Sequence, residues 1–173
     1  MTGSSAPWSL IDGRGTGVAW NLSVSVSNFI SAAVGSGNTS QPLRTIYGSN
    51  LAITPGSFAL AADTASGITP ATGSYDSDAG NGSAQATGST AAVVAHPLAY
   101  SNSDAPVSGS TLVSGADSVA GTNLGGGAKG GYVFSAPSFT LTIPRNAYKS
   151  NVDNSSGSPV IQPYVAVITF TIS

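Results

Sequence analysis

Alternating apolar and polar positions predict two long β-strands near the ends of the chain. In residues 18–29 the apolar positions recur at every second residue, with Ala, Asn and Ser between them: Val18, Trp20, Leu22, Val24 and Val26. Near the other end, Tyr164, Ala166, Ile168, Phe170 and Ile172 form a second apolar row. Val165 and Val167 place apolar side chains on the opposite face of this strand, which predicts a central position in its sheet.

A shorter apolar run at residues 8–11 precedes the first long strand. The intervening Asp12-Gly13 and the glycines that follow supply the positive φ values of a tight reversal, so a β-hairpin is predicted. Residues 139–143 alternate and end at Pro144, which denies the ladder a donor. Other short strands are expected at 43–46, 51–53, 57–60, 91–98, 111–113 and 132–134.

Composition extends this pattern to the whole chain. Only 7% of the 173 residues are charged and no glutamate occurs, so the usual long helix formers are scarce. We therefore expect an all-β fold with little or no helix: one antiparallel β-sandwich, Greek-key or immunoglobulin-like, spanning residues 1–173. Residues 61–130 are expected to be loop-rich, because 61–90 contain almost no large apolar side chains.

The charge distribution and the absence of targeting signals limit the classes of partner and the location that we expect. The five cations are scattered at Arg14, Arg44, Lys129, Arg145 and Lys149, and this arrangement cannot track nucleic-acid phosphates. No apolar run is long enough to span a membrane, no cysteine is present, and the first residues do not resemble a signal peptide. The Ser-, Thr-, Gly- and Asn-rich composition is typical of secreted bacterial surface and fibre proteins, so we expect an extracellular or cell-surface location.

Two motifs resemble the WxL domain family of Gram-positive surface proteins. Residues 8–22 contain an Asp-x-Arg-Gly turn that leads into a Trp-x-Leu strand, and residues 164–172 resemble the closing motif of the family. The positions that carry the likeness are Trp8, Asp12, Arg14, Trp20, Leu22, Tyr164, Phe170 and Ile172. The chain departs from the family pattern because Phe170 and Ile172 replace a Trp and a Leu, Ala19 replaces a Gly, and the usual strand upstream of the first Trp is missing.

This resemblance implies a non-catalytic, secreted β-rich module that attaches to cell wall or associates with other surface proteins. The residues themselves favour structural roles. Trp20 and Phe170 lie on apolar strand faces, so both are expected in the core, while Trp8 is open to either burial or exposure. Asp12 and Arg14 flank a glycine, which favours a turn stabilised by the carboxylate.

Candidate catalytic and cofactor chemistry is sparse. His96 is the only histidine, so a serine triad has a single candidate base, and the seven aspartates lie mainly in turn-like contexts. Residues 125–130 match G-x-G-x-x-G, but a strand-like segment follows where a phosphate site needs a helix. Residues 76–82 begin like a calcium loop, yet Gly80 replaces a ligand and no glutamate closes it. We therefore expect no enzyme activity and no cofactor, with calcium as an alternative.

Two functions remain open at this point. The first is a WxL-like structural or adhesive surface protein that binds cell-wall polymer or other surface proteins. The alternative is a self-assembling subunit of an extracellular filament or surface layer, joined by β-strand complementation, with residues 1–7 or 61–90 as the donated segment. A carbohydrate-binding module is a third class, for which the loop-like aromatic candidates are Tyr47, Tyr75, Tyr100 and Tyr148.

Overall fold

A computed structural model describes residues 1–12, 18–33, 43–60, 93–101, 103–116, 130–148, 151–153 and 160–173. These residues are nearly all in antiparallel strands, with one short 3₁₀ turn, η2 (Gly48–Asn50), so the prediction of an all-β fold is confirmed. The strands are β1 (Thr2–Ser4), β2 (Trp8–Asp12), β3 (Trp20–Val26), β4 (Phe29–Ser31), β5 (Arg44–Ile46), β6 (Leu51–Thr54), β7 (Phe58–Leu60), β8 (Val93–Ala95), β9 (Val107–Gly115), β10 (Gly130–Phe134), β11 (Ser138–Leu141), β12 (Asn151–Asp153), β13 (Val160–Gln162) and β14 (Ile168–Ile172).

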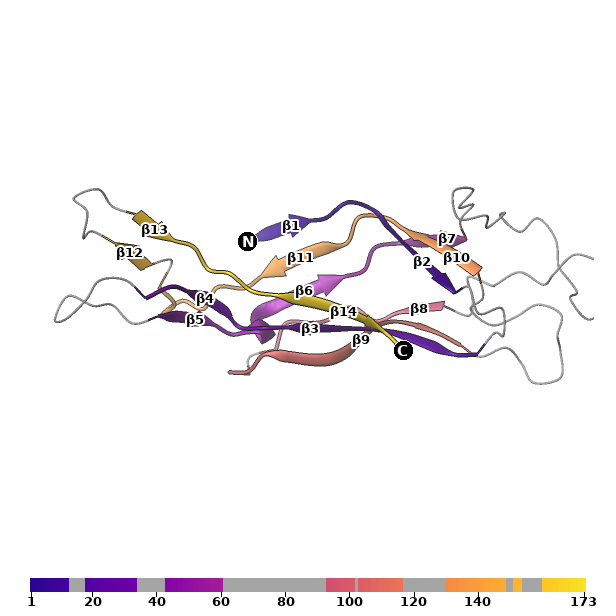
Figure 1. Ribbon diagram of the computed structural model, residues 1–173, viewed down its shortest axis with the longest axis horizontal. Coiled ribbons are helices and arrows are strands. Elements are labelled where there is room, and N and C mark those ends of the chain that lie inside the picture. Colours follow the sequence, from indigo (N-terminus) through magenta and orange to yellow (C-terminus); the bar gives the residue numbers. More distant parts are fainter. Residues whose placement is uncertain are drawn as a thin grey trace, which may run out of the picture.

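One layer consists of three long strands that are each interrupted once (Figure 1). The order β1–β11–β6 on one side of the interruption becomes β2–β10–β7 on the other. Residues 5–7, 135–137 and 55–57 separate the paired segments, three on each strand, so the register continues without an inserted residue. The two short sheets are therefore one kinked three-stranded sheet.

Prolines explain the position of the kink. Pro7, Pro55 and Pro137 occur within the three interruptions, and a proline cannot donate to a ladder. Gly56 has a φ of 85°, which favours glycine, and its backbone packs against Ser135. The Ser57 N–H donates to the Ser135 Oγ at 3.0 Å, so a side chain replaces one of the missing ladder contacts.

The second layer is a four-stranded sheet in the order β14–β3–β9–β8. β3 continues into β4, where Ile30 forms an isolated bridge with Val165 and extends the pairing beyond β14. Two further hairpins, β4–β5 and β12–β13, lie toward the same end of the molecule (Figure 1).

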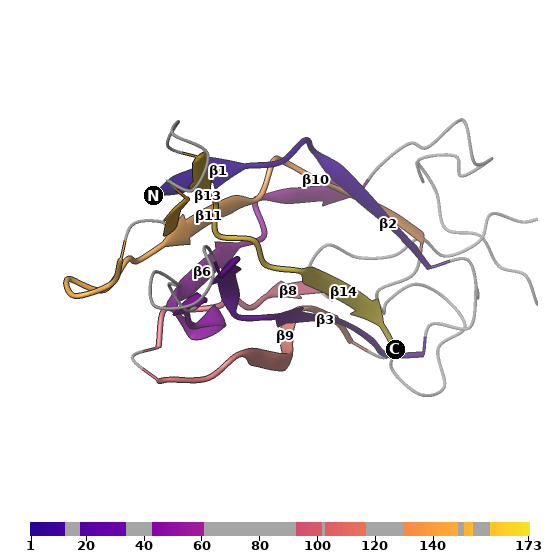
Figure 2. The same cartoon turned by 60° about the vertical axis from the view of Figure 1, so that its left-hand side comes forward.

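The core lies between the two layers, which face each other in Figure 2. Trp20 on β3 lies 6.2 Å, centroid to centroid, from Tyr132 on β10, and both side chains are fully buried. The alternation predicted for β3 is observed, because its residues are alternately buried and exposed or half-buried. The buried hydrophobic cluster comprises Leu10, Trp20, Leu22, Val24, Val26, Leu51, Ile53, Val93, Leu112, Val113, Tyr132 and Phe134.

Most predicted strand positions are confirmed, but two predictions about pairing are wrong. β2 does not form a hairpin with β3, since β2 pairs with β10 and β3 pairs with β14 and β9 in the other layer. β14 is an edge strand rather than a central one, because it lies at the end of its sheet. The apolar residues of its second face, Val165 and Val167, are exposed. Residues 61–90 lie outside the described residues, and the Greek-key or immunoglobulin-like arrangement stays a prediction.

Candidate functional site

The two long sides of the molecule are built differently, and the first is closed by backbone hydrogen bonds. On this side the N–H groups of Ile53 and Leu98 donate to each other's carbonyl oxygens, both at 2.9 Å. The Ser49 N–H donates to the Ala105 carbonyl, and the Ser49 carbonyl accepts from the Ser101 N–H. The chain between β8 and β9 therefore connects the two layers here.

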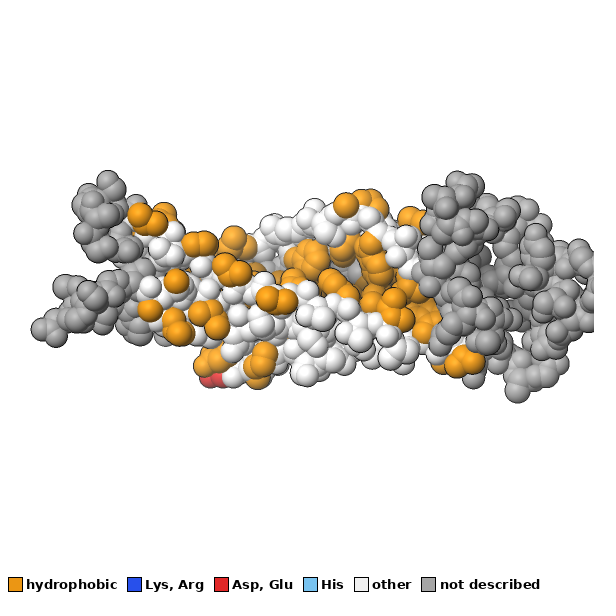
Figure 3. Space-filling model, in the orientation of Figure 1, with side chains coloured by type: hydrophobic (Ala, Val, Ile, Leu, Met, Phe, Trp, Pro, Cys, Tyr) orange, Lys and Arg blue, Asp and Glu red, His pale blue; other side chains and the backbone are white. Residues whose placement is uncertain are grey.

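The opposite side holds an apolar groove between β2 and β14. Its volume is about 370 Å³, and Figure 3 shows the corresponding hollow with hydrophobic side chains gathered in and around it. None of the lining side chains is charged: Ser5, Trp8, Ser9, Leu10, Leu22, Ile53, Leu112, Pro137, Phe139, Phe170 and Ile172. The kink contributes to the groove directly, since Ser5 and Pro137 belong to the interruptions.

Both strands that flank the groove are sheet edges. Within the described ranges, β2 pairs only with β10, and β14 pairs only with β3. A strand edge carries a row of backbone N–H and C=O groups that can pair with another chain. The groove is therefore bordered by unpaired backbone on two sides and floored by apolar side chains.

The hydrogen bonds between β3 and β14 identify which residues of β14 offer these groups. Asn21 and Ser173 exchange two bonds, at 2.9 and 3.0 Å, so Ser173 is directed toward β3. In an antiparallel pair, such residues alternate with residues whose backbone groups point away from the partner. The backbone N–H and C=O groups of Ile168, Phe170 and Ile172 therefore point to the free edge.

Two of these residues also expose apolar side chains toward the groove. Phe170 is 48% exposed and Ile172 is 60% exposed, although both belong to the groove lining. The prediction that Phe170 is a buried core aromatic is wrong. The alternation correctly gave its face of the strand, but the facing layer does not extend far enough to cover it.

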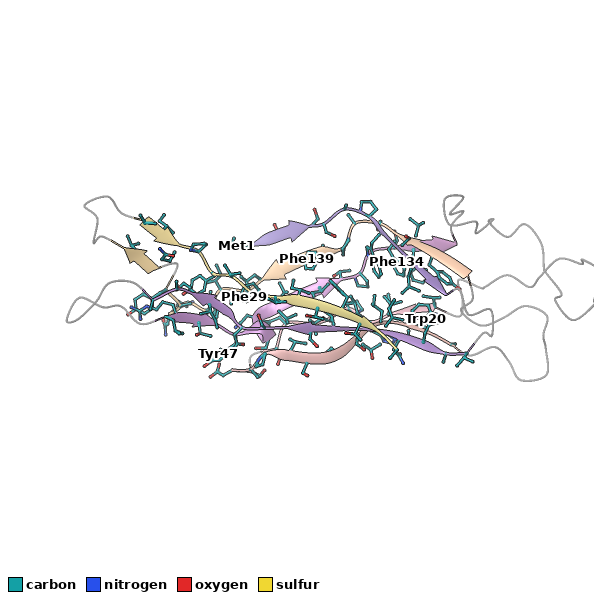
Figure 4. All side chains as sticks on the ribbon, in the orientation of Figure 1. Met1, Trp20, Phe29, Tyr47, Phe134 and Phe139 are labelled. Carbon is teal, nitrogen blue, oxygen red and sulfur yellow. The ribbon has the colours of Figure 1, made fainter. Side chains whose placement is uncertain are left out.

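The two tryptophans of the motif, unlike Phe170, contact the hydrophobic core. Trp20 is buried as predicted, and Leu22 beside it on β3 forms part of the groove floor. Trp8 is half-buried and stacks on Phe134, with ring centroids 4.2 Å apart and planes 11° apart. Figure 4 shows Phe134 and Trp20 at the end of the molecule that carries β2 and β10, and Phe139 nearer the middle. Trp8 thus combines a core contact with one wall of the groove.

The remaining motif residues do not join this site. Asp12 ends β2, where it pairs with Gly130, and Arg14 lies outside the described residues. The Tyr164 hydroxyl donates to the Tyr148 carbonyl at 2.6 Å. Burial raises the pKa of the Tyr164 hydroxyl, and the nearby Arg44 guanidinium opposes that shift. Arg44 also lies 3.6 Å from the centroid of the Tyr148 ring, a cation–π contact.

The structure corrects two expectations about the N-terminal segment. A strand does precede the first Trp, since β1 occupies Thr2–Ser4. Residues 1–4 are not a free donor either, because β1 pairs with β11 and the Met1 ammonium donates to the Leu141 carbonyl at 2.9 Å. The other predicted donor, 61–90, lies outside the described residues.

A histidine and a serine, two of the three residue types of a catalytic triad, form a hydrogen bond in this structure. The His96 Nε2 and the Ser114 Oγ are 2.8 Å apart, with His96 directly after β8 and Ser114 on the neighbouring strand β9. A triad also needs a carboxylate that orients the histidine. Among the described residues, the His96 ring contacts the Ser114 hydroxyl and makes no hydrogen bond to a carboxylate. Neither His96 nor Ser114 belongs to the groove lining.

Other candidate chemistry is limited to what the described residues contain. No group of three His, Cys, Asp or Glu side chains comes together there as metal ligands. No helix among them has the length and apolarity needed to cross a membrane. The calcium-like segment 76–82 and most of the glycine run 125–130 lie outside these residues, as does Tyr75. A strand, β10, does follow the glycine run as predicted.

Sequence reasoning missed the floor of the groove. Ile53, Leu112 and Phe139 were predicted only as strand positions, and Pro137 was not singled out, because alternation marks a buried face without indicating which part of that face stays uncovered. Comparison with protein-family models, curated proteins and solved structures finds no match for this chain.

Proposed function

We propose that this protein is a non-enzymatic structural subunit that associates with other polypeptides by β-strand addition at the groove between β2 and β14. The observation that carries the proposal is the combination of an apolar groove with an unpaired strand edge at β14. A segment added there would satisfy backbone groups and cover exposed apolar side chains in one step. Of the functions considered from the sequence, the self-assembling subunit of an extracellular filament or surface layer fits this geometry best.

The composition of the edge supports the same proposal. Proteins usually protect free edges with lysine, proline or inward-pointing charges, which discourage pairing with other chains. β14 reads Ile-Thr-Phe-Thr-Ile and carries none of these residues. An edge of this kind is expected to aggregate without control or to have a defined partner strand.

The absence of charge in the groove lining also restricts the partner. A cationic or anionic segment would lose hydration in the groove without gaining an opposite charge. An extended polypeptide with uncharged, alternately apolar side chains is the matching ligand. Attachment to cell-wall polymer, which the WxL resemblance implies, stays a prediction without a site among the described residues.

A pair of lysine substitutions tests this function. Phe170→Lys places a charge at the groove and on the free edge of β14, whereas Val133→Lys places the same charge at an exposed position of β10, which lies between β2 and β7. We expect wild type and Val133→Lys to form concentration-dependent assemblies, visible by electron microscopy and light scattering, and Phe170→Lys to form fewer and smaller ones.

A wild-type sample that stays monodisperse at high concentration would contradict the proposal, as would equal assembly by both lysine variants. Circular dichroism and thermal unfolding of the variants establish that any difference does not arise from misfolding. Because Phe170 is half exposed, its replacement should leave the fold intact.

A further inference from the structure

β14 has a palindromic sequence. Ile168-Thr169-Phe170-Thr171-Ile172 reads the same in both directions about Phe170. We infer that the strand added to β14 is β14 of a second copy of this chain, running antiparallel about a two-fold axis through Phe170. The inference rests on the proposed function and names its partner.

A two-fold contact requires a surface that is complementary to itself. Antiparallel pairing centred on Phe170 places Phe170 opposite Phe170, and Ile168 opposite Ile172 of the second copy. Thr169 then faces Thr171. Every cross-strand pair consists of identical residue types, and aromatic, β-branched and threonine pairs are among the favourable ones. No such symmetry exists for β2, which reads Trp-Ser-Leu-Ile-Asp.

The backbone of β14 fits this register. Ile168, Phe170 and Ile172 are the residues whose N–H and C=O groups point to the free edge, as derived above from the Asn21–Ser173 pair. A register centred on Phe170 pairs these three residues with one another, so all their outward groups find partners. An axis through Thr169 or Thr171 would also bring outward-pointing residues opposite one another. It would, however, leave Ile172 or Ile168, respectively, without a partner in the second β14.

The side chains and charge favour a second copy as the occupant. Phe170 and Ile172 are 48% and 60% exposed, and both would be covered by their counterparts. The edge and the groove are uncharged, so two copies meet without repulsion. A stable interface covers about 800 Å² on each partner, more than a five-residue edge provides, so the contact must extend onto the groove rim.

A contact of this symmetry joins two copies and then closes. The two four-stranded sheets would become one continuous sheet across the axis. A filament or layer built from such pairs needs a second contact at another surface. The pair is therefore the building block of the proposed assembly.

Cysteine cross-linking tests the axis, since the chain contains no cysteine of its own. Opposed residues of a hydrogen-bonded antiparallel pair have Cα atoms about 5.5 Å apart, within the range that a disulfide spans. The Phe170→Cys variant should therefore form a disulfide-linked dimer under mild oxidation. Absence of this dimer at concentrations where the protein associates would overturn the inference.

A mixed sample tests the register and keeps Phe170 in place. Ile168→Cys and Ile172→Cys should cross-link to each other when mixed, because these residues face one another across the axis. Neither variant alone should do so, since the two equivalent positions would lie four residues apart along the strand, about 14 Å. Cross-linking of either variant alone, at a yield equal to that of the mixture, would overturn the inference.

The outcome for wild type separates the two proposals. If wild type associates but the cysteine pattern is not observed, strand addition at the groove stands and the second-copy register is wrong. If wild type remains monomeric in sedimentation across the concentration range, both proposals are contradicted. Thermal unfolding of each reduced variant shows whether a negative result reflects loss of the fold.

Discussion

The two long sides of this molecule differ in how their backbone groups are paired. On one side, Ile53 and Leu98 join the layers by a reciprocal pair of hydrogen bonds, and Ser49 is held by Ala105 and Ser101. On the other, β2 and β14 leave their outer edges unpaired across an apolar groove. Neither side depends on charged residues at these contacts. The difference arises from which backbone groups find partners within the chain.

The two sides separate the contacts that stabilise the fold from the edge at which we propose association. The closed side satisfies its buried polar backbone, as stable interiors require. The open side leaves the same kinds of groups available for a second polypeptide. Stability and association should therefore respond to different substitutions, and variants on the two sides can test that separation.

The largest expected effect comes from paired isoleucine truncations. Ile53 closes one side through its backbone, but its side chain lies in the core at the floor of the groove; Ile53→Ala removes this fully buried side chain and should lower the free energy of unfolding by about 2–5 kcal/mol. Ile172→Ala, at the rim of the groove, removes a side chain that is 60% exposed and should cost less than about 1 kcal/mol. Chemical denaturation of dilute, monomeric samples measures both. Equal losses would show that the rim on β14 is as tightly packed as the core.

A pair of glycine substitutions should have the next largest effect. At Gly48 an added Cβ would lie 2.6 Å from the Val26 carbonyl oxygen, so Gly48→Ala should destabilise the protein by about 1–3 kcal/mol. At Gly3 on β1 nothing lies within 4 Å of an added Cβ, and Gly3→Ala should be close to neutral. The same denaturation measurement applies. A neutral Gly48→Ala would contradict the close approach of η2 to β3.

The smallest expected effect concerns a tether beside the open side. The Tyr164 hydroxyl, just before β14, donates to the carbonyl of Tyr148, beyond β11, and loss of this bond in Tyr164→Phe should cost at most about 1 kcal/mol. Because burial raises the pKa of Tyr164 in the folded state, its contribution is complete below the unfolded pKa of about 10 and is lost as pH rises through the folded value.

Unfolding measured from neutral to alkaline pH checks this sign. Wild type should lose stability over the tyrosine range more steeply than Tyr164→Phe, and ultraviolet titration of the two proteins should differ by one phenol with a raised pKa. If the two proteins showed the same pH dependence of unfolding, ionisation of the Tyr164 hydroxyl would make no contribution to stability.

Local pattern was enough to predict most strands of the fold. The alternation in β3 gave its buried face residue by residue, and the apolar run before Pro144 gave β11, which ends at Leu141. The same reasoning failed for β14, where apolar residues on both faces predicted a central strand and the structure shows an edge. It also predicted a hairpin between neighbouring segments that belong to different layers, and it did not predict β1, β12 and β13.

The sequence by itself determined that the chain is all-β, nearly free of charge, and composed of short strands whose buried faces can be read from a period of two. The tertiary structure decided which strands are neighbours, and therefore that β2 and β14 are edges and that Phe170 is half exposed. The physical reason is that alternation specifies a face, whereas pairing depends on partners far away along the chain, as in β2 with β10. The groove exists because no described strand lies between those two edges.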